Sequence, residues 1–84
     1  MPELHDTQRM TPELLEDIGK ALYGTSYKIQ LAEFLGVDRR RINHWLDGDR
    51  PIPVGITAEL LENAKHRKLA VDEAIEKLEK IMDQ

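Results

Sequence analysis

Residues 29–48 constrain the fold most, because they contain two short helical patterns joined by a glycine turn. Apolar residues recur at spacings of three and four on both sides of Gly36, which indicates two helices in contact. Gly36 permits the backbone to reverse, and Ala32 supplies the small side chain that a close helix crossing needs. The apolar side chains that we expect to fix the crossing angle are Leu31, Leu35, Val37, Ile42 and Trp45.

Capping residues set the limits of these two helices. Thr25 or Ser26 is the expected N-cap of the first, which should end near Leu35. Asp38 is the expected N-cap of the second, which should run over residues 39–47 and end at Gly48. The sequence therefore predicts a helix-turn-helix.

A further helix precedes this pair. Thr11 is a good N-cap, Pro12 suits the first helical position, and Glu13 places a negative charge in the first turn. Gly24 should end the helix in the left-handed conformation. Its expected apolar face consists of Leu14, Leu15, Ile18 and Leu22.

The chain after the rigid connection Arg50-Pro51-Ile52-Pro53 keeps close to helical spacing up to Met82. Charged residues interrupt the apolar stripe between Lys65 and Lys68, and Asp72 could cap a new helix. One long helix and two shorter helices joined near residues 68–72 are both compatible with the pattern, and we favour the single helix.

The predicted fold class is therefore all-α: a small helical bundle with a helix-turn-helix and a C-terminal helical extension. We expect residues 1–10 to form a disordered tail and residues 11–67 to form the helix-turn-helix domain. Residues 68–84 should form the extension.

Charge is distributed unevenly along the chain, whose formal net charge is −4. Residues 25–50 carry five basic and four acidic side chains and form the only positive segment of the three into which we divide the chain. Local field rather than total charge governs contact with phosphate. The acidic total lowers the expected strength of nonspecific binding to nucleic acid without excluding such binding.

Several kinds of site are not expected. There is no cysteine, and His5, His44 and His66 lack the spacing of metal ligands, so we expect no metal and no cofactor. No constellation of titratable groups suggests an enzyme, and Glu59, Glu62 and His66 form a solvated helical stripe. No apolar run could serve as a signal peptide or membrane span, so a cytoplasmic location and no membrane partner are expected.

The helix expected over residues 39–47 leaves four donor-rich side chains off its apolar stripe: Arg39, Arg40, Asn43 and His44. They occupy its N-terminal half, which favours contact with DNA over a merely solvated face. Trp45 follows Ile42 by three positions, so we expect it to lie in the core rather than to stack on bases.

The segment from Ala21 to Arg50 resembles the helix-turn-helix of the Cro and phage-repressor class, the lambda-repressor-like DNA-binding domains of phages and bacteria. It differs at Phe34 and Leu46, where the class usually has polar residues, and in its C-terminal extension. The shared elements are Leu31-Ala32, Leu35-Gly36-Val37, Ile42, Trp45 and Gly48 at matching separations, with Ala21-Leu22-Tyr23-Gly24 before them and Ile52-Pro53 after them.

The resemblance implies a transcriptional regulator, expected to be a repressor, that reads double-stranded DNA in the major groove with the helix starting at Arg39. Arginine side chains there can donate two hydrogen bonds to guanine. The expected base contacts are Arg39, Arg40, Asn43 and His44. The expected phosphate contacts are Ser26, Tyr27, Lys28, Arg41 and Arg50, the first three because a helix N-terminus favours an anion.

One recognition helix covers too few base pairs for genomic specificity, so we expect a homodimer. The expected dimerisation stripe is Val71, Ile75, Leu78 and Met82, at spacings near those of a helix–helix seam. The same stripe could instead fold back on the helix-turn-helix and complete a monomer. An alternative function is a protein-interaction module, adaptor or antitoxin-like, that keeps this fold without binding DNA.

Overall fold

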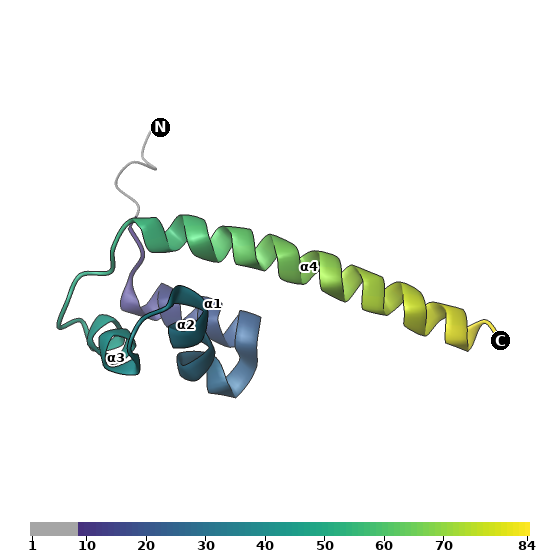
Figure 1. Ribbon diagram of the computed structural model, residues 1–84, viewed down its shortest axis with the longest axis horizontal. Coiled ribbons are helices and arrows are strands. Elements are labelled where there is room, and N and C mark those ends of the chain that lie inside the picture. The colour runs from purple at the N-terminus through teal and green to yellow at the C-terminus, as the bar shows by residue number, and fades with distance from the viewer. Residues whose placement is uncertain (1–8) are drawn as a thin grey trace.

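The structure, a computed structural model, describes residues 9–84 and shows a small all-α bundle, as predicted (Figure 1). The predicted tail of residues 1–10 lies outside the described part except for Arg9 and Met10, and Met10 packs against the core. The elements are α1 (Pro12–Tyr23), the 3₁₀ helix η2 (Gly24–Ser26), α2 (Tyr27–Leu35), α3 (Arg39–Asp47) and α4 (Gly55–Met82).

Helix α1 begins after Thr11 and ends at Gly24, as predicted, but the conformation of Gly24 differs from the predicted one. The Thr11 hydroxyl accepts a hydrogen bond from the Leu14 N–H at 3.1 Å, and Pro12 occupies the first turn. Gly24 has φ 78° and ψ −152°, so it lies outside the left-handed helical region that we predicted. These angles are accessible almost only to glycine, because a Cβ would clash with the backbone.

Ser26, one of the two predicted residues, occupies the N-cap position of α2, but the side-chain hydrogen bond expected of an N-cap is absent. Neither Thr25 nor Ser26 caps the helix through its side chain, and η2 leads directly from α1 into α2. The short 3₁₀ segment makes the turn between the two helices by its own tighter backbone geometry.

The turn between α2 and α3 follows from Gly36 and Asp38. Gly36 is left-handed, with φ 68° and ψ 35°. The Val37 N–H donates to the Ala32 carbonyl at 3.0 Å and the Gly36 N–H to the Glu33 carbonyl at 3.3 Å, the two bonds of a Schellman motif. The Asp38 carboxylate then accepts from the Arg40 N–H at 3.2 Å and begins α3 at the predicted position.

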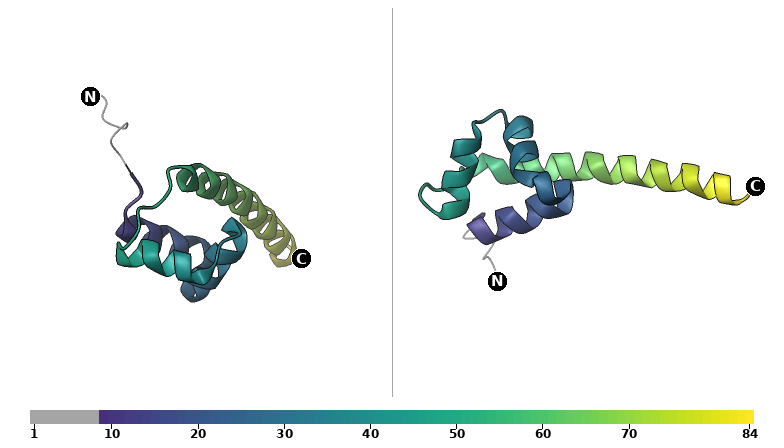
Figure 2. Two further views of the ribbon diagram at one scale, coloured as in Figure 1. Left: turned by 60° about the vertical axis from the view of Figure 1, so that its left-hand side comes forward. Right: turned by 90° about the horizontal axis from the view of Figure 1, so that it is seen from below.

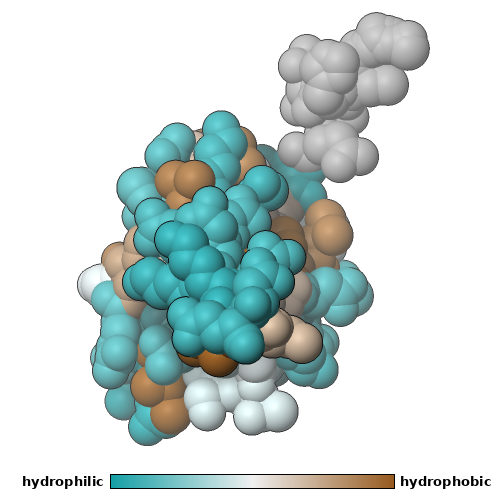
Figure 3. Space-filling view, turned by 90° about the vertical axis from the view of Figure 1, so that its right-hand side faces the viewer, coloured by the Kyte–Doolittle hydropathy of each residue, from teal (hydrophilic) through white to brown (hydrophobic). Residues whose placement is uncertain are grey.

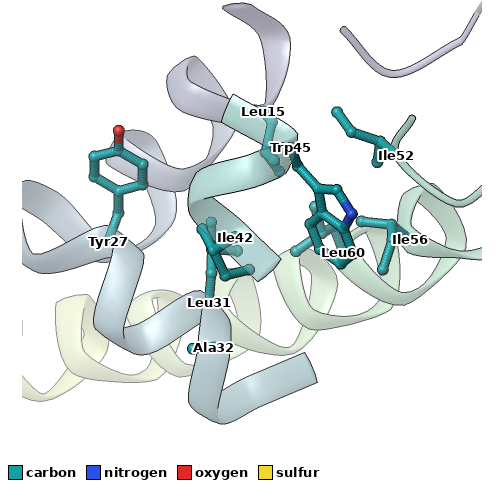
Figure 4. Packing of buried hydrophobic residues seen from close by; sticks show 9 residues of the cluster. All are labelled: Leu15, Tyr27, Leu31, Ala32, Ile42, Trp45, Ile52, Ile56 and Leu60. Atoms are coloured by element: carbon teal, nitrogen blue, oxygen red, sulfur yellow. The ribbon is translucent and has the colours of Figure 1, made fainter. Parts of the chain in front are cut away.

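The core lies where α1, α2 and α3 meet the first turns of α4 (Figure 4). Ala32 is buried with the core side chains of α2 and α3, as the helix crossing requires. Trp45 is 3% exposed, which confirms the prediction that it is a core residue. The complete buried cluster is Leu15, Tyr27, Leu31, Ala32, Ile42, Trp45, Ile52, Ile56 and Leu60, with Leu35, Val37 and Leu46 partly buried against it.

Helix α4 is one continuous helix, as we favoured from the sequence. Ile56 and Leu60 anchor its start in the core. Every residue from Lys65 onward is exposed, and the C-terminal half extends beyond the other helices (Figures 1 and 2). The predicted dimerisation stripe therefore does not fold back: Val71, Ile75, Leu78 and Met82 are 56%, 46%, 60% and 85% exposed.

Candidate nucleic-acid interface

The outer face of α3 is the candidate site. The side chains of Ile42 and Trp45 are buried, so one side of this amphipathic helix faces the core. Because successive residues differ by about 100° around the axis, the polar side chains of the first turns face outward. Arg39, Arg40 and Asn43 are exposed and His44 is half-buried, so all four predicted base contacts lie at or near the surface.

A shallow hollow on one side of this face brings α2 and α3 together. Its lining includes Lys28 from the first turn of α2 and Arg39, Arg40 and Asn43 from α3. An ammonium group, two guanidinium groups and an amide thus border one concave surface. Such a set of donors suits anionic or acceptor-rich ligands.

A second hollow lies on the other side of α3, along the connection that follows it. The turn after α3 is closed by hydrogen bonds from the Asp49 and Arg50 N–H groups to the His44 carbonyl, at 2.9 and 3.3 Å. This turn brings Arg50 back toward α3. The hollow is lined by Asp38, Arg40, Arg41, His44, Trp45, Arg50, Pro51 and Pro53.

The arginines of this surface are free of ion pairs with described residues. Within residues 9–84, the side-chain ion pairs are Glu16–Lys20 and Lys68–Asp72, both outside α3. Asp38 borders both hollows, but its carboxylate already accepts the capping hydrogen bond of α3. Arg39, Arg40 and Arg41 are exposed, so their guanidinium groups are accessible to an external acceptor.

Two predicted phosphate contacts, Tyr27 and Ser26, do not line either hollow, whereas Lys28, Arg41 and Arg50 do. Tyr27 is a core residue, 7% exposed, and its ring packs at the edge of the buried cluster (Figure 4). We therefore correct the prediction that Tyr27 contacts phosphate, because the ring fills space beside Gly19 that α1 and α2 share. Ser26 is exposed at the end of η2, but it borders neither hollow.

Asp47 belongs to the outer face of α3 and was not singled out from the sequence. It follows Arg40 by seven positions and Asn43 by four, so helical geometry places it on the same side, and it is exposed. The spacing alone would have revealed it. Because a carboxylate only accepts hydrogen bonds, the C-terminal end of the outer face presents an acceptor, whereas its first turns present donors.

Neither a metal-binding group nor a membrane-spanning helix is found among residues 9–84. Within residues 9–84, no group of three or more His, Asp or Glu side chains could hold a metal ion, and His5 lies outside this range. No helix of the described chain has the length and apolar composition needed to cross a membrane.

Comparison of the chain with protein-family models, with curated proteins and with solved structures found no match.

Proposed function

We propose that this chain is a sequence-specific double-stranded DNA-binding transcriptional regulator, acting as a repressor, that reads the major groove with α3. The observation that carries the proposal is the outer face of α3, where exposed arginines that form no ion pair with any residue of the described range 9–84 lie between two hollows that hold further basic side chains. The major groove is about 12 Å wide and admits one helix. A single exposed helix with donors at its first turns suits that groove.

The side chains divide into two sets by their position. Arg39 and Arg40 can each donate two hydrogen bonds to guanine O6 and N7, and Asn43 can pair with adenine in the same bidentate manner. His44, one turn after Arg40, can reach a base edge. These four residues supply the base readout.

Phosphate contacts are proposed on both sides of α3. Lys28 borders one hollow, and Arg41 and Arg50 border the other. A helix in the major groove has a phosphate backbone on each side, so this arrangement could hold both strands and fix the register of α3. We also propose a phosphate contact from Ser26, which is exposed and lies just before α2.

Regulation of a genome requires a longer site than one α3 can cover, so we propose that the chain binds as a homodimer. The exposed stripe of Val71, Ile75, Leu78 and Met82 supports this proposal because the described chain leaves it uncovered.

Selection of duplexes from a random pool at low salt, followed by fluorescence anisotropy, tests DNA binding. Arg39→Ala and Arg40→Ala should each weaken specific binding by about 1–3 kcal/mol and relax the preference at one base pair. Lys77→Ala removes an exposed charge of α4, far along the chain from α3, and should leave the affinity unchanged. Equal binding by both arginine variants and the unaltered chain would contradict the groove assignment.

The second candidate is a protein-interaction module that does not bind DNA. It is favoured by the net charge of −4 and by the exposed apolar side chains of α4. The same experiment separates the two, because this module would show no binding to random duplex even at low salt.

A further inference from the structure

Every residue of α4 from Lys65 to Met82 is exposed, although Arg67 lies over the Tyr23 ring of α1. Apolar side chains lie at the surface beside hydrophilic ones when the molecule is viewed from the end where α4 stops (Figure 3). Most helical stability in proteins comes from packing of an apolar face rather than from helix propensity. A partner surface on this segment would supply such packing.

The apolar face of α4 follows a seven-residue repeat. Residues 61, 64, 68, 71, 75, 78 and 82 are separated alternately by three and four positions. This alternation is that of the a and d positions of a two-stranded coiled coil. The a positions are Leu61, Lys68, Ile75 and Met82, and the d positions are Ala64, Val71 and Leu78.

We propose that a second copy of this chain covers this face and that the two α4 helices run antiparallel, with Ala64 opposite Met82 of the other copy. In this register each a residue faces a d residue of the other copy. The stripe from 64 to 82 of one copy therefore covers the same stripe of the other copy. The paired layers are Ala64 with Met82, Lys68 with Leu78, and Val71 with Ile75, each occurring twice.

Lys68 favours the antiparallel direction. A parallel pair would place the two Lys68 side chains in one core layer, where like charges oppose each other. The antiparallel pair places the apolar stem of Lys68 against Leu78 of the other copy and leaves its ammonium group at the edge. The small Ala64 also faces the long Met82, which fills the space that two facing alanines would leave.

The charges that flank the seam change sign along it. Lys65 and Arg67 lie beside its beginning, Asp72 lies beside its middle, and Glu79 lies beside its end. Antiparallel pairing brings Lys65 near Glu79 of the other copy, twice. Asp72 then lies near its symmetry mate, but Lys68 of the same helix holds each Asp72 carboxylate at 3.3 Å and offsets that repulsion.

This charge complementarity is the reason for choosing a second copy rather than a different protein as the occupant. A partner needs an apolar stripe of equal length and a charge pattern that is the reverse of this one. The same helix supplies both when its direction is reversed.

Disulfide formation between cysteine variants tests the direction. The chain has no cysteine, so any disulfide in a single-cysteine variant must form at the introduced position. A mixture of Lys68→Cys chains and tagged Leu78→Cys chains should form the mixed disulfide, and neither variant alone should form one. In the proposed register the two Leu78 positions are ten residues apart along the axis, about 15 Å, which is beyond disulfide reach. Efficient disulfides within each single variant would indicate a parallel pair and overturn the proposal.

A charge exchange tests the register independently of cysteine chemistry. Lys65→Glu should raise the dimer dissociation constant about three- to tenfold, and the added change Glu79→Lys should restore it. Glu73→Lys, on the outer side of the same helix, is the matched control and should have little effect. Lack of restoration would contradict the register.

Sedimentation of the unaltered chain at tens of micromolar should show a dimer, and a monomer would overturn the seam. The inference does not depend on DNA binding. All of these measurements are made without DNA, so failure of the proposed function would leave their outcome unchanged.

Discussion

The Asn63 side-chain amide of α4 donates a hydrogen bond to the Tyr23 hydroxyl of α1, joining residues 40 positions apart in the sequence. The Arg67 guanidinium lies over the same ring, 5.1 Å from its centroid. These two contacts lie beyond Leu60, the last buried residue of α4. They extend the attachment of α4 by two turns and so fix the direction in which its free half leaves the bundle.

Tyr23→Phe should lower stability by about 0.5–1.5 kcal/mol, because it removes one neutral hydrogen bond and keeps the ring under Arg67. Asn63 is only half-buried and can bond to water in the variant, so the loss should lie toward the lower end of that range. Urea unfolding followed by circular dichroism measures it. An unchanged midpoint would show that the hydrogen bond contributes nothing to the attachment.

Alkaline pH should destabilise the chain through the same residue. Burial raises the pKa of Tyr23 above its ordinary value of 10.0, and Arg67 opposes this only in part. Above about pH 10 the unfolded chain therefore loses this proton before the folded chain does, and stability falls as pH rises. Unfolding midpoints at pH 9 and pH 11 should converge more closely for Tyr23→Phe than for the unaltered chain. Equal pH dependence in the two chains would contradict the assignment to Tyr23.

Gly19→Ala should destabilise the chain although alanine is the better helix former. A Cβ at Gly19 would lie 2.6 Å from Cδ2 of the buried Tyr27 ring. Overpacking of this kind costs about 1–3 kcal/mol, which exceeds the gain in helix propensity of about 1 kcal/mol. Gly55→Ala is the matched control: nothing lies within 4 Å of the added atom, so it should stabilise by about 0.4–1 kcal/mol. Thermal unfolding of both variants should give shifts of opposite sign.

Trp45→Ala should leave the chain largely unfolded at room temperature. Truncating a buried tryptophan costs on the order of 3–5 kcal/mol, a large fraction of the stability of so small a domain. Trp45 is the single tryptophan, so native emission reports it alone and should be blue-shifted. Trp45→Phe keeps much of the packing and should stay folded. Emission at the wavelength of a solvated indole from the folded chain would contradict the core position.

DNA binding by the proposed dimer should weaken steeply with salt. If each protomer neutralises about three to five phosphates, the slope of log affinity against log salt should be about −5 to −9. Arg50→Ala, which removes one proposed phosphate contact from each protomer, should reduce the slope by about 2 and weaken binding uniformly across sequences. A slope near zero would indicate that phosphate contacts do not carry the affinity.

Local signals made most of the fold predictable. The limits of α3 follow from Asp38 and Gly48, whose capping conformations depend on residue type more than on tertiary contacts. The continuity of α4 followed from the absence of proline and internal glycine after Gly55. The position of Trp45 followed from its spacing to Ile42.

The errors concern features that depend on packing between distant residues. Tyr27 was expected at a phosphate because it begins α2, but contact with Gly19 of α1 buries its ring. Sequence spacing within α2 carries no information about that neighbour. Likewise, the entry into α2 through η2 depends on how α1 and α2 pack, and the hollow beside Arg50 depends on the return of the chain after α3.

Because α4 is one continuous helix, its length sets the separation of the two bundles in the proposed dimer as well as supplying the seam. Its first turns are part of the core that positions α3, and its far end projects as the same rigid rod. In the antiparallel pair the two Ala64 residues stand about 27 Å apart, eighteen residues at 1.5 Å each. Adding one heptad would lengthen the rod by about 10.5 Å and preserve the facing of the seam, whereas adding two residues would turn the seam by about 200°. The distance between two bound DNA sites could thus change only in steps set by the repeat of this helix.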